Sequence, residues 1–101
     1  MKSPAACRNL TDIRSAVNAI DRAILKLLGK RAKYAAAALK YKPDLRAIRD
    51  NTRREQLFAE RKAWAAKQGV GDRLAREVFQ AIVDESRRMH LAGFKARSRA
   101  R

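Results

Sequence analysis

Apolar residues recur every three or four positions along the first long stretch of the chain, from Thr11 to about Tyr41. This spacing is typical of an α-helix, in which each residue is rotated by about 100° from the one before. The stretch contains no proline and one glycine, so it predicts one helix about 45 Å long at 1.5 Å per residue. The apolar stripe within roughly 80° of Ile13 consists of Val17, Ile20, Ile24, Leu27, Leu28, Ala35, Ala38 and Leu39.

Two cations fall inside this stripe. Arg31 projects at about 0° and Lys42, if the helix reaches it, at about 20°. Burying an unpaired cation costs free energy, so the pattern predicts a partner anion, and a bound anionic ligand is one candidate. The alternative is a snorkelling pair that neutralises an acidic residue such as Glu85. The other basic residues of the stretch face the opposite side, where water is expected: Arg22, Lys26, Lys30, Lys33 and Lys40.

The ends of this first helix have recognisable signals. Residues 1–9 predict an irregular lead-in, and either Asn9 or Thr11 can cap the helix. Pro43 ends it, because the residue before a proline avoids the α region. Residues 43–50 are expected to form a connecting loop.

Two further helices complete the pattern. The second is predicted over residues 51–67, with Asp50 or Asn51 as its cap, and glycines follow it. The third is predicted from its cap at Asp72 to about residue 91, with Gly93 just beyond its end, and residues 94–101 form a basic tail that is expected to fray. The apolar faces of these helices place Phe58, Trp64 and Met89 in the core, with Arg61 in a structural role.

These elements predict an all-α fold, one domain over residues 1–101, with one long helix and two shorter ones. No strand-like alternation or internal repeat is present. Two shorter helices would not cover the whole apolar stripe of the long one, and an exposed stripe of that size is a liability. Pairing with a second copy of the chain removes it.

Charge narrows the possible partners. The 101 residues carry a net charge of +15, which favours polyanions, anionic membranes or small anionic ligands. The single cysteine, Cys7, excludes an internal disulfide framework and a thiolate-rich metal site. The chain has neither a membrane-length apolar run nor the apolar core of a signal peptide, so we expect a cytoplasmic protein. A basic helical nucleic-acid binder is the outside alternative, although no recognition helix stands out.

Spacing along the first helix also bears on oligomeric state. Arg14 lies 17 residues before Arg31, about 25 Å along a straight helix, and faces about 100° away. The two arginines therefore cannot hold one small molecule from the same helix, so a functional Arg14 would serve a second site, such as one completed in another copy. Arg31 and Lys42 are 11 residues apart, about 16 Å on nearly the same face, within joint reach of one small dianion.

Several strings resemble the all-helical chorismate mutases: DIRSAVNAID, KRAKYAAAALKYK, RDNTRRE and GVGDRLAREVFQAIVDESRRMH. The segments MKSPAACRNLTDIR and AERKAWA are especially similar to the isochorismate pyruvate-lyase branch of that family. The resemblance covers about residues 1–92. It implies an intertwined homodimer of three-helix chains with two equivalent sites, each containing an arginine from the other subunit, and no cofactor or metal.

The resemblance also implies roles for individual residues. Arg14 matches the arginine donated across subunits, Arg31 the one that holds a substrate carboxylate, and Lys42 the lysine that hydrogen-bonds the ether oxygen and a carboxylate. His90 falls where the family usually has a glutamine or a glutamate facing the ether oxygen. These four are the predicted catalytic residues. Further positions that line or support the pocket are matched by Asp50, Arg53 and Ser86.

The chemistry that such a pocket performs needs no nucleophile or general base. The resemblance implies rearrangement of chorismate to prephenate, with isochorismate cleavage to salicylate and pyruvate as the alternative, or a weak mutase that needs a partner enzyme. Clamps on two carboxylates select a compact conformer, and donors stabilise the ether oxygen as it becomes negative. His90 donates when protonated or in the right neutral tautomer, so turnover is expected to improve as the pH falls through its titration.

Less specific interpretations accompany these roles. Asp50 and Arg53 suit capping and salt bridging at a helix start, Ser86 can bond a carbonyl one turn back, and His90 can be a satisfied core histidine. Arg54 departs from the family, in which many mutases have a glutamate that contacts the substrate hydroxyl.

Overall fold

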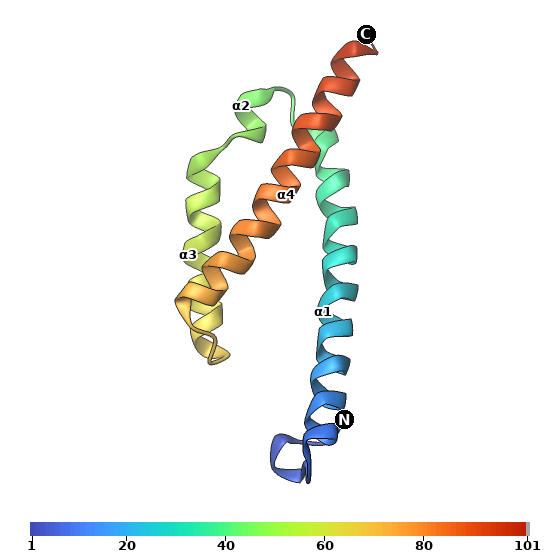
Figure 1. Ribbon diagram of the computed structural model, residues 1–101. Coiled ribbons are helices and arrows are strands. Elements are labelled where there is room, and N and C mark those ends of the chain that lie inside the picture. The colour runs from blue at the N-terminus through green and yellow to red at the C-terminus, as the bar shows by residue number, and fades with distance from the viewer. Residues whose placement is uncertain (101) are drawn as a thin grey trace. The chain divides into compact units, whose positions relative to one another are not determined.

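The computed structural model describes residues 1–100, and within them the secondary structure is helical with no strand (Figure 1). This confirms the all-α prediction. The principal helices are α1 (Leu10–Ala38), α3 (Asn51–Lys67) and α4 (Asp72–Arg99). At 28 residues α4 nearly equals the 29 of α1, so the expectation of one long and two shorter helices was wrong in its proportions. The shorter elements are η1 (Pro4–Ala6), η2 (Leu39–Tyr41) and α2 (Leu45–Ile48).

The chain divides into two compact units, residues 1–34 and residues 35–101. In the first unit, the start of α1 is fixed by side-chain caps. Asn9 Oδ1 accepts a hydrogen bond from the Asp12 amide at 2.9 Å, which makes Asn9 the cap. The Asp12 carboxylate in turn accepts from the Arg8 amide at 3.0 Å and from Lys2 Nζ at 3.1 Å. These bonds explain why the helix begins at Leu10. The lead-in, which was predicted to be irregular, contains the 3₁₀ turn η1.

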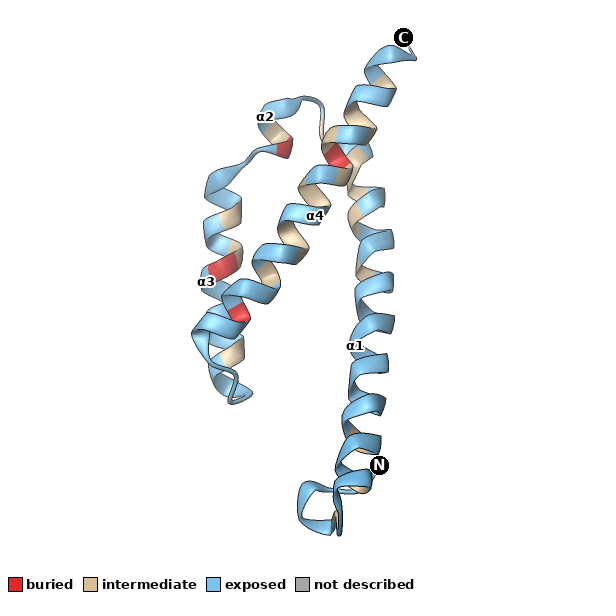
Figure 2. Cartoon of the chain, in the orientation of Figure 1, coloured by how far each residue is buried: buried red, intermediate tan, exposed pale blue. Residues whose placement is uncertain are grey.

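The apolar stripe of α1 is open to solvent in the single chain. None of the α1 residues is buried, and Ile20, Ile24 and Leu27 are 46%, 49% and 64% exposed (Figure 2). A monomer would leave these side chains in water along several turns, which is unfavourable for a helix held mainly by packing.

The second unit is organised around α4, which packs against α3, α2 and η2. Its buried residues are Ile48, Phe58, Ala75 and His90. Phe58 is therefore a core residue as predicted, and Met89 is half-buried. Trp64 is 54% exposed, so its assignment to the core was wrong for this chain taken alone.

The segment between α1 and α3 contains a helix that the sequence analysis treated as loop. Asp44 caps α2 by accepting from the Ala47 amide at 2.9 Å, and one turn follows. Asp50 then caps α3 by accepting from the Arg53 amide at 3.0 Å, which settles the choice between Asp50 and Asn51. Two aspartates six residues apart thus start two helices in succession.

Both ends of α4 differ from the prediction. Asp72 is the first helical residue rather than the cap, which is Gly71. The helix also continues through Gly93 to Arg99, so the expected end near residue 91 and the frayed tail over residues 94–99 were wrong. The glycine has a packing role instead, because a Cβ built at Gly93 would lie only 2.5 Å from Leu39 Cδ2. Residue 101 lies outside the described residues.

Candidate functional site

Three contacts join the end of the first helical segment to α4, all within the second unit. His90 Nε2 lies 2.6 Å from the Ala35 carbonyl oxygen, and Arg97 Nη2 donates to the Lys42 carbonyl oxygen at 3.0 Å. Between them, Gly93 lets the Leu39 side chain approach its backbone. Residue numbers increase in the same direction along both members of these pairs, so the two helical segments run parallel at this contact (Figure 1). We call these six residues the seam: Ala35, Leu39, Lys42, His90, Gly93 and Arg97.

The seam fixes the hydrogen positions of His90. The residue is only 7% exposed. A carbonyl oxygen can only accept a hydrogen bond, so the ring nitrogen facing Ala35, Nε2, must carry the hydrogen. That leaves Nδ1 as the nitrogen for any other partner. In the neutral ring Nδ1 is therefore an acceptor, and it becomes a donor only when the ring is doubly protonated.

Lys42 stands where the helical segment ends. It is the C-cap of η2, its backbone is extended with φ −108° and ψ 101°, and its amide donates to the Leu39 oxygen at 3.0 Å. The residue is half-buried. Because η2 is a tighter 3₁₀ turn, the direction of Lys42 cannot be extrapolated from the α-helical projection of the sequence. The structure thus links two predicted site residues, Lys42 and His90, through one seam.

The remaining predicted residues of this unit make local contacts. Asp50 is exposed and caps α3, and Arg53 Nη1 lies 3.2 Å from Glu60 Oε1. These are the capping and salt-bridging contacts of the less specific interpretation, and a ligand role for either residue stays a prediction. Ser86 is half-buried on α4, one turn before His90.

Arg14 and Arg31 belong to the first unit, where both lie on α1. Arg14 is exposed and Arg31 is half-buried. Glu85, the acidic partner considered for Arg31 and Lys42, forms an ion pair with Arg88, whose Nε lies 3.0 Å from Glu85 Oε2. The hydrogen bond from Arg88 lowers the pKa of the Glu85 carboxyl, so its charge is already compensated on α4 itself. The roles of the two arginines stay predictions.

Arg54, which departs from the family pattern, has clear partners. Its Nη1 lies 2.7 Å from Asp84 Oδ1 on α4, and its guanidinium stacks at 5.3 Å from the centre of the Phe58 ring. Its side chain is 18% exposed. An arginine has no acceptor atom, so it cannot receive a hydrogen bond from a ligand hydroxyl as a glutamate could.

Three members of the seam were not predicted from the sequence. Gly93 was interpreted as a helix end and Arg97 as part of a frayed tail, while the Ala35 carbonyl carries no side-chain signal at all. The identical separation of 55 residues in the pairs 35–90 and 42–97 is visible only once both helices are placed.

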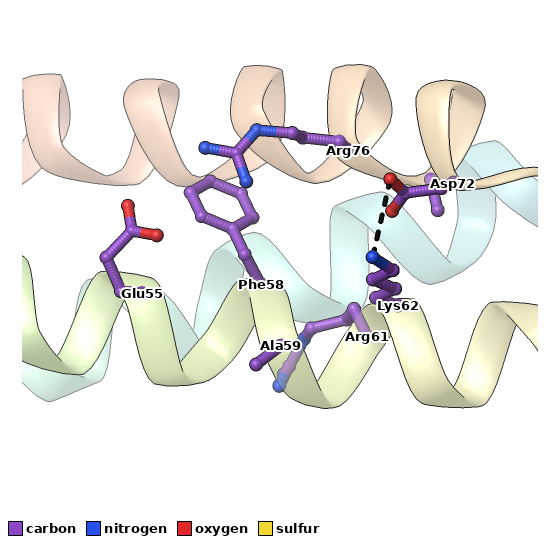
Figure 3. Close-up of a pocket in the computed structure, with 8 residues that line it drawn as sticks. Glu55, Phe58, Ala59, Arg61, Lys62, Asp72 and Arg76 are labelled. Atoms are coloured by element: carbon purple, nitrogen blue, oxygen red, sulfur yellow. Dashed lines mark ion pairs between the residues drawn. The ribbon is translucent and has the colours of Figure 1, made fainter.

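The second unit also contains cavities, and these are lined by residues outside the seam. One of about 170 Å³ opens between α3 and α4 (Figure 3), where the Arg76 guanidinium lies 4.7 Å from the centre of the Phe58 ring and Lys62 Nζ lies 3.9 Å from Asp72 Oδ2. None of the predicted site residues lines it. Another, of about 530 Å³, follows residues 43–52 and includes Asp50.

A third hollow is an apolar groove of about 310 Å³ where α3 ends and α4 begins. Trp64, Leu74 and Val78 line it and are 54%, 59% and 44% exposed. Arg61 also lines it, and its guanidinium lies 4.7 Å from the centre of the Trp64 ring and 5.6 Å from the centre of the Phe79 ring. This supports the structural role predicted for Arg61.

Two further observations concern residues 1–100. No group of three or more His, Cys, Asp or Glu side chains in this range could hold a metal ion. None of the helices in it combines the length and the apolar character that crossing a membrane requires.

The structure is that of a small all-helical protein in which one seam includes two of the predicted site residues, Lys42 and His90. Comparison with known proteins makes this specific: the family model for chorismate mutase type II matches residues 13–91, and the chain belongs to this family. A similar protein is the isochorismate pyruvate lyase of Pseudomonas aeruginosa, which is 35% identical over 83 residues. That alignment covers 82% of this chain and 82% of the relative.

Proposed function

We propose that the protein is a chorismate mutase that rearranges chorismate to prephenate. The observation that carries the proposal is the family match from residue 13 to residue 91, because every predicted site residue from Arg14 to His90 lies inside it. The seam adds physical support, since it holds Lys42 and His90 through bonds to one helix pair.

The proposed mechanism relies on binding and electrostatics. Arg31 and the partner subunit's Arg14 hold the two carboxylates, and this selects the compact conformer in which the reacting carbons meet. Lys42 and His90 face the ether oxygen, which gains negative charge as its bond to carbon lengthens. Donors placed there stabilise the transition state more than the ground state, and each is typically worth about 10²- to 10³-fold in rate.

Arg54 is expected to limit this activity. Its contacts with Asp84 and Phe58 hold it in place, and it offers no acceptor to the substrate hydroxyl. We therefore expect weaker binding of the hydroxyl than in mutases with a glutamate at this position.

Isochorismate pyruvate lyase activity is the second candidate. The 35% identity to the Pseudomonas protein of that name favours it. Elimination of pyruvate from isochorismate also breaks a bond to an ether oxygen. The same arginines could therefore hold the carboxylates, and the same donors could stabilise the ether oxygen. The residues of the pocket do not separate the two reactions.

A homodimer is part of the proposal. The apolar stripe of α1 and the groove beside Trp64 are both exposed in the single chain. A second copy of the chain would supply apolar cover for both surfaces, and it would also supply the Arg14 that the spacing argument assigns to another subunit. The cytoplasmic location stays a prediction.

The test is a paired assay of purified protein with chorismate and with isochorismate, on the wild type and on Lys42→Ala. Lys40→Ala is the matched control, because Lys40 is an exposed lysine two residues away that stacks on Tyr41. Prephenate from chorismate supports the mutase, and salicylate from isochorismate supports the lyase. We expect Lys42→Ala to lose about 10²-fold or more and Lys40→Ala to keep full activity. No turnover of either substrate by the wild type would refute both candidates.

A further inference from the structure

Two members of the seam, Gly93 and Arg97, lie outside the family match, and Arg97 lies six residues beyond its end at residue 91. Arg97 is half-buried, its Nη2 donates to the Lys42 carbonyl oxygen at 3.0 Å, and its guanidinium stacks 5.0 Å from the centre of the Phe94 ring. One guanidinium thus contacts both an aromatic ring and the Lys42 carbonyl oxygen.

The residue that Arg97 contacts is one whose backbone leaves the helix. Lys42 follows a 3₁₀ turn, has an extended backbone, and precedes Pro43, which has no amide hydrogen to continue a helical ladder. Its amide is bonded locally to Leu39, whereas its carbonyl is tied to α4 by Arg97. The side chain of a lysine is a flexible four-carbon stem, so where its ammonium group can reach depends on where the backbone is held.

We propose that Arg97 is a positioning residue for catalysis: it fixes the backbone of Lys42 so that the Lys42 ammonium meets the ligand. This inference rests on the proposed function, in which Lys42 contacts the substrate. Arginine suits the task because a planar guanidinium can stack on a ring while it donates to an oxygen in its plane. A displacement of about 1 Å at a catalytic group can cost about 10²-fold in rate, so a lost backbone anchor has a kinetic effect.

Two other roles for Arg97 have to be separated from this one. Its charge could act only by attracting an anionic substrate, or its contacts could only stabilise the end of α4. Arg99 is the matched control for charge, because it is an exposed arginine two residues further along the same helix. The control for stability is the effect of Arg97→Ala in a Lys42→Ala background. If Arg97 only stabilised the end of α4, its effect would not depend on the Lys42 side chain.

The kinetic experiment compares Arg97→Ala, Arg97→Lys and Arg99→Ala on whichever substrate the wild type converts. We expect Arg97→Ala to lower kcat by about 10- to 100-fold with a smaller change in KM, Arg97→Lys to recover part of the loss, and Arg99→Ala to match the wild type. In a Lys42→Ala background, Arg97→Ala should cause no further loss. Equal effects of Arg97→Ala and Arg99→Ala, or full additivity with Lys42→Ala, would overturn the proposal.

A second measurement judges the link without any turnover. Hydrogen exchange of the Lys42 amide should become faster in Arg97→Ala and stay unchanged in Arg99→Ala, because loosening the carbonyl anchor frees the turn that the amide closes. Unchanged exchange in Arg97→Ala overturns the inference. If the wild type converts neither substrate, the proposed function fails and the inference about catalysis fails with it, while this exchange result still decides whether Arg97 holds Lys42.

Discussion

The ring of His90 is held by the backbone of Ala35, with Nε2 2.6 Å from the carbonyl oxygen. This bond assigns the hydrogen of the neutral ring to Nε2 and leaves Nδ1 without one. A glutamine at this position would offer an amide donor at every pH. Histidine in this setting can donate through Nδ1 only after it gains a second proton. The hydrogen bond to Ala35 therefore leaves the neutral ring with no donor for a ligand.

The tautomer is directly measurable because the chain contains a single histidine. We expect ¹⁵N spectra of the neutral ring to show hydrogen on Nε2 and a bare Nδ1. His90→Gln replaces the bare Nδ1 with an amide that can donate, so we expect its kcat/KM at neutral pH to exceed that of the wild type. A neutral ring with its hydrogen on Nδ1, or a glutamine variant no faster than the wild type, would contradict this interpretation.

Gly93 and Leu39 should behave as a coupled pair in stability measurements. Gly93→Ala would place a methyl group 2.5 Å from the present position of Leu39 Cδ2, so the leucine side chain must move. Alanine also favours the helix by about 1 kcal/mol relative to glycine, so the net change in the free energy of unfolding should stay within about 1 kcal/mol. Leu39→Ala makes room, and Gly93→Ala in that background should be stabilising. Denaturant titrations of the four proteins measure this coupling, and strictly additive values would show that the two residues do not compete for space.

Donation of Arg14 across subunits can be tested by mixing inactive chains. Arg14→Ala and Lys42→Ala should each be nearly inactive as homodimers. After unfolding and refolding together, half of the dimers are mixed, and each mixed dimer has one site with both residues intact. The mixture should therefore recover about a quarter of the wild-type activity. Mixtures as inactive as their parents would place both residues in the same chain's site, and a monomer in analytical ultracentrifugation would remove the dimer altogether.

The start of α1 should respond to acid in a defined way. Hydrogen bonds from the Arg8 amide and from Lys2 lower the pKa of Asp12 below its ordinary value of 3.8. A lowered pKa means that the stabilisation is complete above about pH 3.8 and is lost as the pH falls through the pKa of the folded state. The amide resonance of Arg8 should therefore shift at low pH in the wild type and stay constant in Asp12→Asn. The same shift in both proteins would show that Asp12 is not its cause.

The sequence allowed the helices to be predicted because their signals are local. The apolar period of α1, the Asn9 cap, the Asp50 cap and the stop at Pro43 each depend on a few neighbouring residues. α2 was missed because a four-residue helix is too short to show a period, although Asp44 is a suitable cap.

The candidate site was predictable only where a side chain itself carries the signal. Lys42 stood out as a cation among apolar positions, and His90 as a substitution within a family pattern. The partners that hold them did not, because the Ala35 carbonyl is chemically like every other carbonyl and Arg97 lies among several similar basic residues. Gly93 was misassigned because a glycine that ends a helix and a glycine that admits a neighbouring side chain look alike in sequence.

The position of the seam has a practical consequence for how the protein is shortened or tagged. A chain trimmed at residue 91, where the family match ends, keeps His90 but removes Gly93 and Arg97. Such a fragment would retain the residues that define the family and lose the clasp that secures Lys42. An affinity tag therefore belongs ahead of the first helix, and the last two turns of α4 should be left in their native form.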